Sequence, residues 1–315
     1  LGRRRGPGVD SCFLELKAWQ SPATRSSAPL HFVPMSKRKD KKKKSQKSTE
    51  GWRSAKTSDR HELYELSVQN VEGEIDFVDK VWERLRDRKA QRIREDFCGT
   101  FAAACEWIRR RDDNTAVGVD LSREVLDWGR HRNLPELTKD QIDRLEILEK
   151  DVRSSGVSEV DSVLAMNFSY FLFKTRKELL EYFKTVRGSL AEDGIFICDA
   201  YGGSDSFTEM EEERHLDGFT YVWDQNYYNP VTGDVVNHIH FRFPDGSSMD
   251  EAFTYEWRLW TIPEIRELLT EAGFGKVTVW WEGDDEAGEE GDGEFEPSER
   301  GEACPGWIAY LTAER

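Results

Sequence analysis

Short apolar segments alternate with amphipathic segments along the middle of the chain. The apolar segments predict strands at residues 92–96, 116–120, 145–148, 161–166 and 195–199. Between several of them, apolar positions recur at helical spacing and predict helices at 102–111, 123–132 and 176–190. This alternation predicts β-α-β units and therefore an α/β fold.

The pattern continues on both sides of this region. Residues 59–86 place apolar side chains at helical spacings, with an expected break at Gly73. Towards the C-terminus, Thr261 and Pro263 favour the start of a helix at 264–272 that stops at Gly273. Two further apolar strands, 277–281 and 307–311, are expected to close the sheet as an antiparallel hairpin.

Residues 205–260 depart from the alternation. The segments GFTYVWDQNYYN, VVNHIHFRF and EAFTYEWRLW alternate in polarity, are rich in aromatic residues and are divided by PVTGD and PDGSS turns. They predict an inserted antiparallel β ribbon that covers the active site. Its aromatic side chains either hold an amine or methylated ammonium by cation–π attraction or pack the ribbon on the domain.

The two charged segments suggest the domain limits. Residues 1–57 lack periodicity and are expected to form a disordered basic arm before a domain at 58–315. Residues 36–47 carry eight basic residues and one acid, which indicates a solvated charge run, a nuclear-import signal or a nucleic-acid arm. Met35 is an alternative start of the chain. Residues 282–303 are expected to form a solvated, disordered acidic loop.

Composition narrows the function. A net charge of −16 argues against a protein that coats nucleic acid with its whole surface. Five scattered cysteines without a C-x-x-C pair indicate reduced thiols and an intracellular protein, cytoplasmic or, through the basic run, nuclear. No apolar run reaches the roughly 18 residues of a membrane span. His238 and His240 share one side of a strand, but no third ligand accompanies them, so no metal is expected.

The turn after the first strand, Glu95 to Phe101, carries the chemistry. Gly99 permits close backbone approach to a ligand, and the following helix offers unpaired N–H groups. Asp120 ends the next strand, 25 residues after Glu95, where an acid accepts hydrogen bonds from a ribose. The turn lacks the G-x-G-x-x-G glycines of a dinucleotide site, and its acid suits an amine or sulfonium better than a pyrophosphate.

These residues resemble the first motif of class I S-adenosylmethionine-dependent methyltransferases, which often reads D-x-G-C-G-T-G. Glu95, Cys98, Gly99 and Thr100 match it, whereas Phe97 and Phe101 replace two of its glycines. The resemblance covers about residues 60–311. It implies a doubly wound, Rossmann-like, mostly parallel sheet of about seven strands with the β ribbon inserted.

The resemblance also implies roles for particular residues. In the family, a helix before the first strand folds over the cofactor, and an acid after the third strand receives the adenine amino group. At the end of the fourth strand, base-methylating members carry [DN]-P-P-[YF]; this chain has Asn167 and Tyr170 without the prolines. The implied cofactor contacts are Tyr64, Glu95, Cys98, Gly99, Thr100, Asp120, Leu121, Asp151, Val152 and Asn167, and the implied catalytic residues are Asn167, Tyr170 and Tyr201.

The sequence therefore predicts an enzyme that uses S-adenosylmethionine, releases S-adenosylhomocysteine and methylates a small molecule, with an amine as the favoured acceptor. One alternative is a nucleic-acid or protein methyltransferase guided by the lysine-rich arm. Another is an inactive methyltransferase-like binding or scaffold protein whose glycine motif is closed by Phe97 and Phe101. A nicotinamide oxidoreductase is the least favoured, because the phosphate-binding glycines are missing.

Overall fold

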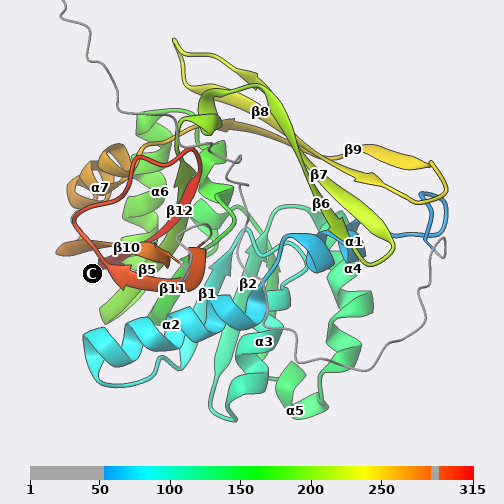
Figure 1. Ribbon diagram of the computed structural model, residues 1–315. Helices are drawn as coiled ribbons and strands as arrows, with labels where there is room; N and C mark the ends of the chain where they lie inside the picture. Colours follow the sequence, from blue (N-terminus) through cyan, green and yellow to red (C-terminus); the bar gives the residue numbers. More distant parts are fainter. Residues whose placement is uncertain (1–52, 285–290) are drawn as a thin grey trace, which may run out of the picture.

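The computed structural model describes residues 53–284 and 291–315 (Figure 1). One sheet of eight strands forms its centre, in the order β11-β10-β12-β5-β4-β1-β2-β3. Its strands are β1 (Arg92–Asp96), β2 (Thr115–Asp120), β3 (Leu145–Glu149), β4 (Val160–Ala165), β5 (Leu190–Gly202), β10 (Lys276–Asp284), β11 (Gly291–Pro297) and β12 (Trp307–Glu314).

Five neighbouring strands of this sheet run parallel. β1 pairs with β2 and β4, β2 pairs with β3, and β4 pairs with β5, all in parallel. β12 is antiparallel to both β5 and β10, as expected for the closing hairpin. The carboxyl ends of the parallel strands therefore share one edge of the sheet, which is where open α/β sheets bind ligands.

Helices cover both faces of the main sheet. Side chains from α2, α3 and α4 form one core with Ile93 of β1, and side chains from α6 and α7 pack on the opposite face. The helices are α1 (Arg60–Ser67), α2 (Val71–Arg86), α3 (Ala102–Arg110), α4 (Arg123–Arg132), α5 (Lys139–Ile142), α6 (Arg176–Ser189) and α7 (Ile262–Glu271), with short 3-10 turns η1 (Leu134–Glu136), η2 (Val152–Ser154), η3 (Ser169–Leu172) and η4 (Asp205–Phe207).

The inserted ribbon forms a separate antiparallel sheet of four strands in the order β6-β7-β8-β9. Its strands are β6 (Met210–Leu216), β7 (Phe219–Tyr228), β8 (Asp234–Arg242) and β9 (Ser248–Arg258). β6 was not expected, because its residues MEEERHL are mostly charged. Charged residues suit this strand, since it lies at an edge of the sheet and exposes every second side chain.

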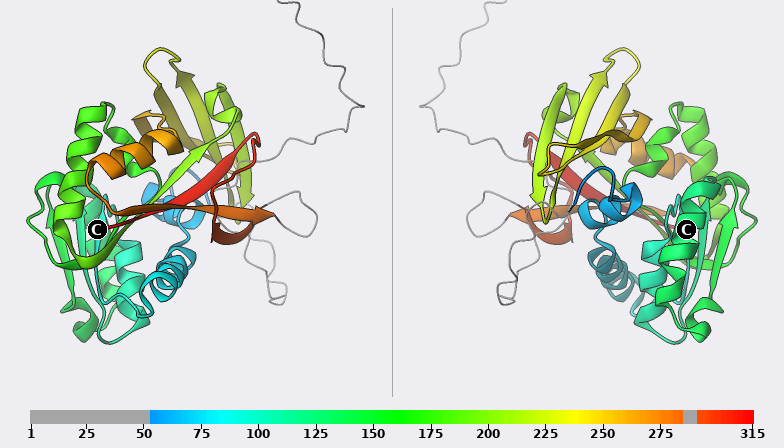
Figure 2. Two further views of the ribbon diagram at one scale, coloured as in Figure 1. Left: turned by 90° about the vertical axis from the view of Figure 1, so that its left-hand side faces the viewer. Right: turned by 90° about the vertical axis from the view of Figure 1, so that its right-hand side faces the viewer.

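α1 joins the ribbon to the main domain at the base of the second sheet (Figures 1 and 2). Arg60 donates to the carbonyl oxygen of Ala252 in β9 (3.4 Å) and pairs with Glu124 of α4 (2.5 Å). The break between α1 and α2 lies at residues 68–70, not at Gly73, because the Asn70 side chain accepts the Gly73 N–H and starts α2.

Part of the expected acidic loop, 282–303, is strand: residues 282–284 end β10, residues 291–297 form β11, and residues 298–303 belong to no strand. β11 pairs antiparallel with β10, and its acids contact basic residues of α2. Lys80 pairs with Glu294 (3.2 Å) and with Glu296 (2.8 Å), and Arg84 also pairs with Glu296. Residues 285–290 and the basic run at 36–47 lie outside the described residues.

Candidate active site

The turn between β1 and α3 keeps a glycine-like backbone without its glycines. Phe97, Gly99 and Phe101 have φ values of +57°, +54° and +51°, and these are the three positions at which the family motif has glycine. A left-handed backbone is costly for phenylalanine. The sequence has therefore kept the shape of the motif while changing two of its residues.

The two phenylalanine rings pack into opposite sides of the domain. Phe101 is fully buried and lies against Gly129 of α4, where a Cβ atom would come within 2.5 Å of its ring. Phe97 lies near the rings of Phe173 and Tyr182, with centroids 6.0 and 5.7 Å away. Aromatic packing, with Phe101 buried and Phe97 partly buried, offsets the backbone strain.

We expect Phe97→Gly to change the affinity for S-adenosylmethionine by less than about threefold. The Phe97 ring packs against α6 and the segment before α6. Its removal should therefore change side-chain packing more than the backbone conformation of the turn. A matched calorimetric titration of wild type and variant checks this. An affinity gain of tenfold or more in the variant would mean that the Phe97 ring obstructs the site.

Glu95 and Asp120 hold the backbone of the turn. Glu95 is buried and its Oε2 accepts the N–H of Ala104 in the first turn of α3 (2.9 Å). Asp120 accepts the Gly99 N–H through Oδ2 (2.9 Å) and the Ser122 N–H through Oδ1 (2.8 Å). Asp120 therefore fixes the turn at Gly99, and Glu95 fixes the start of α3.

The other predicted residues of the turn lie around it. Cys98 is buried, and the Thr100 hydroxyl donates to Glu65 of α1 (2.6 Å). Leu121 follows Asp120 and is 70% exposed, an open position for an apolar side chain beside a ligand site. Tyr64 projects from α1 to the ring of Phe253 in the ribbon, 5.0 Å between centroids.

Asp151 and Val152 follow β3 at the same edge of the sheet. Asp151 accepts the backbone N–H of Arg153 (2.9 Å) and pairs with its guanidinium (2.6 Å). Hydrogen bonding from Arg153 lowers the pKa of Asp151. The Asp151 carboxylate thus caps the start of the η2 turn, a structural role that requires no ligand. The side chain of Val152 is buried.

The segment after β4 is held in an unusual backbone conformation by a buried carboxylate. Asn167 and Phe168 both have positive φ, +57° and +58°. Asp199 of β5 accepts both of their N–H groups, at 2.8 and 2.9 Å. One side chain therefore fixes the backbone of Asn167, a predicted catalytic residue, and of its neighbour Phe168.

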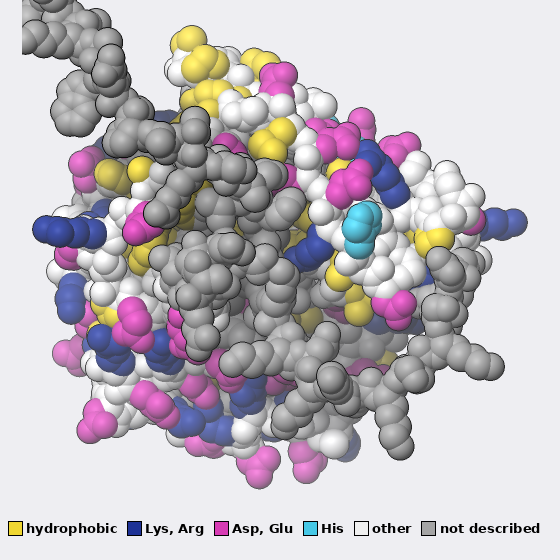
Figure 3. Space-filling view, in the orientation of Figure 1, with side chains coloured by type: hydrophobic (Ala, Val, Ile, Leu, Met, Phe, Trp, Pro, Cys, Tyr) yellow, Lys and Arg dark blue, Asp and Glu magenta, His cyan; other side chains and the backbone are white. Residues whose placement is uncertain are grey.

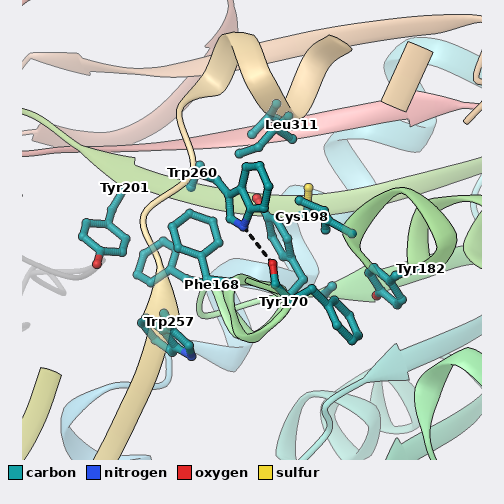
Figure 4. Close-up of a cluster of buried hydrophobic side chains, with 14 of the residues drawn as sticks. Phe168, Tyr170, Tyr182, Cys198, Tyr201, Trp257, Trp260 and Leu311 are labelled. Carbon is teal, nitrogen blue, oxygen red and sulfur yellow. Dashed lines mark hydrogen bonds between the residues drawn. The ribbon is translucent and has the colours of Figure 1, made fainter. Parts of the chain in front are cut away.

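Tyr170 and Tyr201 belong to a buried aromatic cluster (Figure 4). Tyr170 is fully buried, and its hydroxyl donates to the main-chain oxygen of Asp199 (2.8 Å). Tyr201 is 1% exposed, and its hydroxyl oxygen accepts from Asn237 of the ribbon (3.3 Å). Both tyrosines support the loop from within the core, so we assign neither of them a catalytic role.

A pocket opens between α1, α2, the loop after β4 and the inner face of the ribbon. Aromatic rings dominate its walls, and Glu74 and Asp199 are its two carboxylates. Among the lining residues that the structure describes, none is Lys, Arg or His. They are Tyr64, Val68, Asn70, Glu74, Asn167, Phe168, Asp199, Tyr221, Trp223, Ile239, Tyr255, Trp257, Ile308 and Tyr310.

Burial makes the acids of this region hard to ionise. Desolvation raises the pKa of Glu74 to about 7, and the charge of Asp199 adds to the effect. Desolvation likewise raises the pKa of Asp199 to about 7, against the hydrogen bonds from Phe168 and Asn167. Glu95 has its pKa raised to about 8 by burial, with Glu74 and Asp120 as further contributors. A cationic ligand would restore the charged forms.

These shifts predict a pH-dependent effect of Glu74→Gln on stability. An acid with a raised folded-state pKa contributes stability that is present below its unfolded pKa, 4.5, and is lost as the pH rises through about 7. The melting temperature of the ligand-free variant, relative to wild type, should therefore be higher at pH 8.5 than at pH 5. Thermal unfolding at both pH values measures this, and a difference that does not depend on pH would contradict it.

The histidine pair of the ribbon is used in hydrogen bonding. His240 Nδ1 accepts the N–H of Glu251 (2.7 Å), which leaves the proton on Nε2, 3.3 Å from Asp224. His240, Asp224 and Glu211 form the one described group whose atoms could hold a metal ion, but this tautomer turns a hydrogen, not a lone pair, towards the acids. We therefore assign no metal to it.

Glu74 was missed in the sequence, although a signal was present. It precedes Val78 and Val81 by four and seven residues, so a carboxylate occupies the apolar stripe of the helix. A buried acid on such a stripe indicates either a buried partner or a ligand. The ribbon aromatics Tyr221, Trp223, Tyr255 and Trp257 were expected, and they alternate onto one face that both packs on the domain and lines the pocket.

The chain has sequence similarity to a bacterial protein but matches no protein-family model. The Bacillus subtilis (strain 168) protein named putative methyltransferase YqeM is 24% identical over 189 residues, which are 58% of this chain and 73% of the relative.

Solved structures extend this similarity to most of the chain. An S-adenosylmethionine-dependent methyltransferase from Clostridium acetobutylicum ATCC 824 matches 80% of this chain and 96% of its own, with a TM-score of 0.58 and 17% identity. CalS10 from Micromonospora echinaspora, an amino pentose methyltransferase solved with S-adenosylmethionine bound, matches 81% of this chain and 95% of its own, with a TM-score of 0.57 and 15% identity.

Both comparisons agree with the resemblance seen in the sequence. The strand order of the main sheet, the turn after β1 and the acid after β2 fit the same assignment. The comparisons therefore confirm the predicted Rossmann-like fold, and they show that the chain is similar to S-adenosylmethionine-dependent methyltransferases.

Proposed function

We propose that this protein transfers the methyl group of S-adenosylmethionine to a nitrogen atom of a small molecule. The observation that carries the proposal is the pocket at the carboxyl edge of the sheet, which combines aromatic walls with two buried carboxylates. Such a pocket suits a compact ligand with a basic nitrogen. The likeness in fold to an amino pentose methyltransferase agrees with an amine acceptor.

The cofactor would lie along the carboxyl ends of β1, β2 and β3. Gly99 permits close approach, Asp120 would accept the ribose hydroxyls, and Asp151 with the Val152 N–H would meet the adenine edge. Glu95, Cys98, Thr100 and Leu121 would complete its surroundings, and Tyr64 would cover it from α1. When bound, this cofactor supplies an electrophilic methyl group on sulfur.

The chain contributes position and exclusion of water. Asn167 faces the pocket from a loop that Asp199 holds rigid, so a nucleophile beside it is oriented before reaction. The ribbon and α1 close the pocket from the other side. Positioning and removal of solvent can supply several kcal/mol of the barrier for a displacement of this kind.

The alternative substrates receive less support. On the face in Figure 3, Asp and Glu side chains are interspersed with Lys and Arg, which does not favour a polyanion. An inactive scaffold is disfavoured because Phe97 and Phe101 preserve the backbone of the motif. The helices of the described residues are too short or too polar to span a bilayer.

A screen with labelled S-adenosylmethionine tests the proposal. The full chain is incubated with a panel of small amines and with their alcohol and thiol counterparts, and label transfer and S-adenosylhomocysteine are measured. Transfer to one or more amines is expected. Transfer only to alcohols, thiols, RNA or protein would overturn it.

A further inference from the structure

We propose that Glu74 binds the ammonium group of the acceptor and takes the proton that must leave before methyl transfer. This inference rests on the proposed function and specifies its substrate as a cationic amine at the moment of binding. It assigns a catalytic role to a residue on α2, a helix that precedes the cofactor-binding turn.

The position of Glu74 supports this role. It lines the pocket from one side, the rings of Tyr64, Tyr255 and Trp257 line other sides, and the residue is 7% exposed. A carboxylate within aromatic walls combines the two features that bind alkylammonium ions, a counter-charge and the negative faces of π systems.

The charges around Glu74 point to a positive ligand. The ionisable groups that face it are Asp199 from β5, Glu95 from β1, Tyr64 from α1 and Tyr310 from β12, and all of them are acids. Arg214 of β6 lies outside this wall, over the ring of Tyr221 at 5.2 Å. A ligand that carries a positive charge should therefore bind this pocket more tightly than a neutral or negative one.

Glu74 and Asp199 differ in how they are used. The two carboxylate oxygens of Asp199 accept the N–H groups of Asn167 and Phe168, so Asp199 stabilises the loop after β4. Glu74 has the Asn167 side chain as a hydrogen-bond partner, on the residue predicted to stand nearest the reacting sulfur. The Glu74 carboxylate is thus the one placed to meet a substrate and exchange a proton with it.

The proposed step is balanced without a further reactant. The bound ammonium gives one proton to the Glu74 carboxylate and becomes a neutral amine. Its lone pair forms the N–C bond to the methyl carbon while the C–S bond breaks, and the electron pair of that bond remains on sulfur. The cofactor leaves as the neutral thioether, the product carries the positive charge as a methylated ammonium, and Glu74 later returns its proton to water.

Tetramethylammonium chloride tests the cation site without knowledge of the substrate. Its binding to the full chain is measured by calorimetry at pH 8.5 and pH 5.5, with sodium chloride at equal ionic strength and tert-butanol as a neutral ligand of similar shape. The probe keeps its charge at both pH values. We expect saturable binding at pH 8.5, binding weakened at least fivefold at pH 5.5, and none of tert-butanol.

Two variants separate Glu74 from its surroundings. Glu74→Gln should weaken tetramethylammonium binding at least tenfold at pH 8.5 and reduce its pH dependence, since Asp199 then remains as a titrating carboxylate of the pocket. Asp76→Asn, an exposed acid of the same helix paired with Arg110, should change the binding less than twofold. S-adenosylmethionine should bind Glu74→Gln within about threefold of wild type.

The outcomes distinguish the two proposals. Unchanged tetramethylammonium binding in Glu74→Gln, or no binding to wild type, overturns the role of Glu74. Equal loss of S-adenosylmethionine binding in that variant assigns Glu74 to the cofactor and also overturns it. If the wild-type protein binds tetramethylammonium at Glu74 but does not bind S-adenosylmethionine, the ammonium site is supported and the proposed methyl transfer is overturned.

Discussion

Asp199→Asn is expected to lower the stability of the protein by about 1–3 kcal/mol and its methyl transfer by about 100-fold. The carboxylate accepts two N–H groups from residues with positive φ. An amide offers one oxygen, and its NH2 group would face the other N–H, which is then buried without an acceptor. The loop would relax, and Asn167 would move away from the position in which the Asp199 carboxylate holds its strained backbone.

Thermal unfolding and the amine assay, on the same preparation, measure this effect. Asp193→Asn is the matched control, because it removes an exposed carboxylate from the same strand, one paired with Arg88. That change should cost less than about 1 kcal/mol and leave methyl transfer intact. An Asp199→Asn protein with wild-type activity would show that the loop does not depend on this carboxylate.

Asp120→Ala should weaken the binding of S-adenosylmethionine at least tenfold. In the free protein this carboxylate fixes the N–H groups of Gly99 and Ser122, and in the proposed complex it also meets the ribose. Hydrogen bonds to a charged group contribute about 1.5–3 kcal/mol each, and about 1.4 kcal/mol corresponds to a factor of ten in affinity.

The control for Asp120 is Asp127→Ala on the exposed side of α4, where the acid pairs with Arg130. Its affinity for S-adenosylmethionine should stay within twofold of wild type. If Asp120→Ala binds as wild type does, the ribose contact and the ordering of the turn by Asp120 are both wrong.

Much of the fold could be predicted because the spacing of apolar residues along the sequence indicates which face of each helix or strand is buried. β1, α4 and the turn between β1 and α3 lie where the hydrophobic pattern placed them, and the order of apolar strands and amphipathic helices gave the parallel sheet. β6 and β11 were not predicted, because both are edge strands rich in acids. Edge strands are stabilised by backbone pairing and by charges of other elements, such as Lys80 and Arg84 for β11, which a local pattern does not contain.

The candidate site divides in the same way. Glu95, Gly99 and Asp120 could be proposed as site residues from the sequence because they lie at the ends of strands at the spacing of a known motif. Tyr170 was predicted as a substrate contact from its place after Asn167, but the 3-10 turn η3 directs its ring into the core. Glu74 and the ribbon aromatics meet only in three dimensions, since they come from segments about 150 residues apart that the insertion of the ribbon brings together.

The edge of the sheet around Gly99 is proposed to bind S-adenosylmethionine. Calorimetric titration of the wild-type chain with S-adenosylmethionine, S-adenosylhomocysteine and NADH tests this binding most directly. We predict one site with micromolar affinity for the first two and no binding of NADH. Absence of S-adenosylmethionine binding, or binding of NADH in its place, would contradict the account.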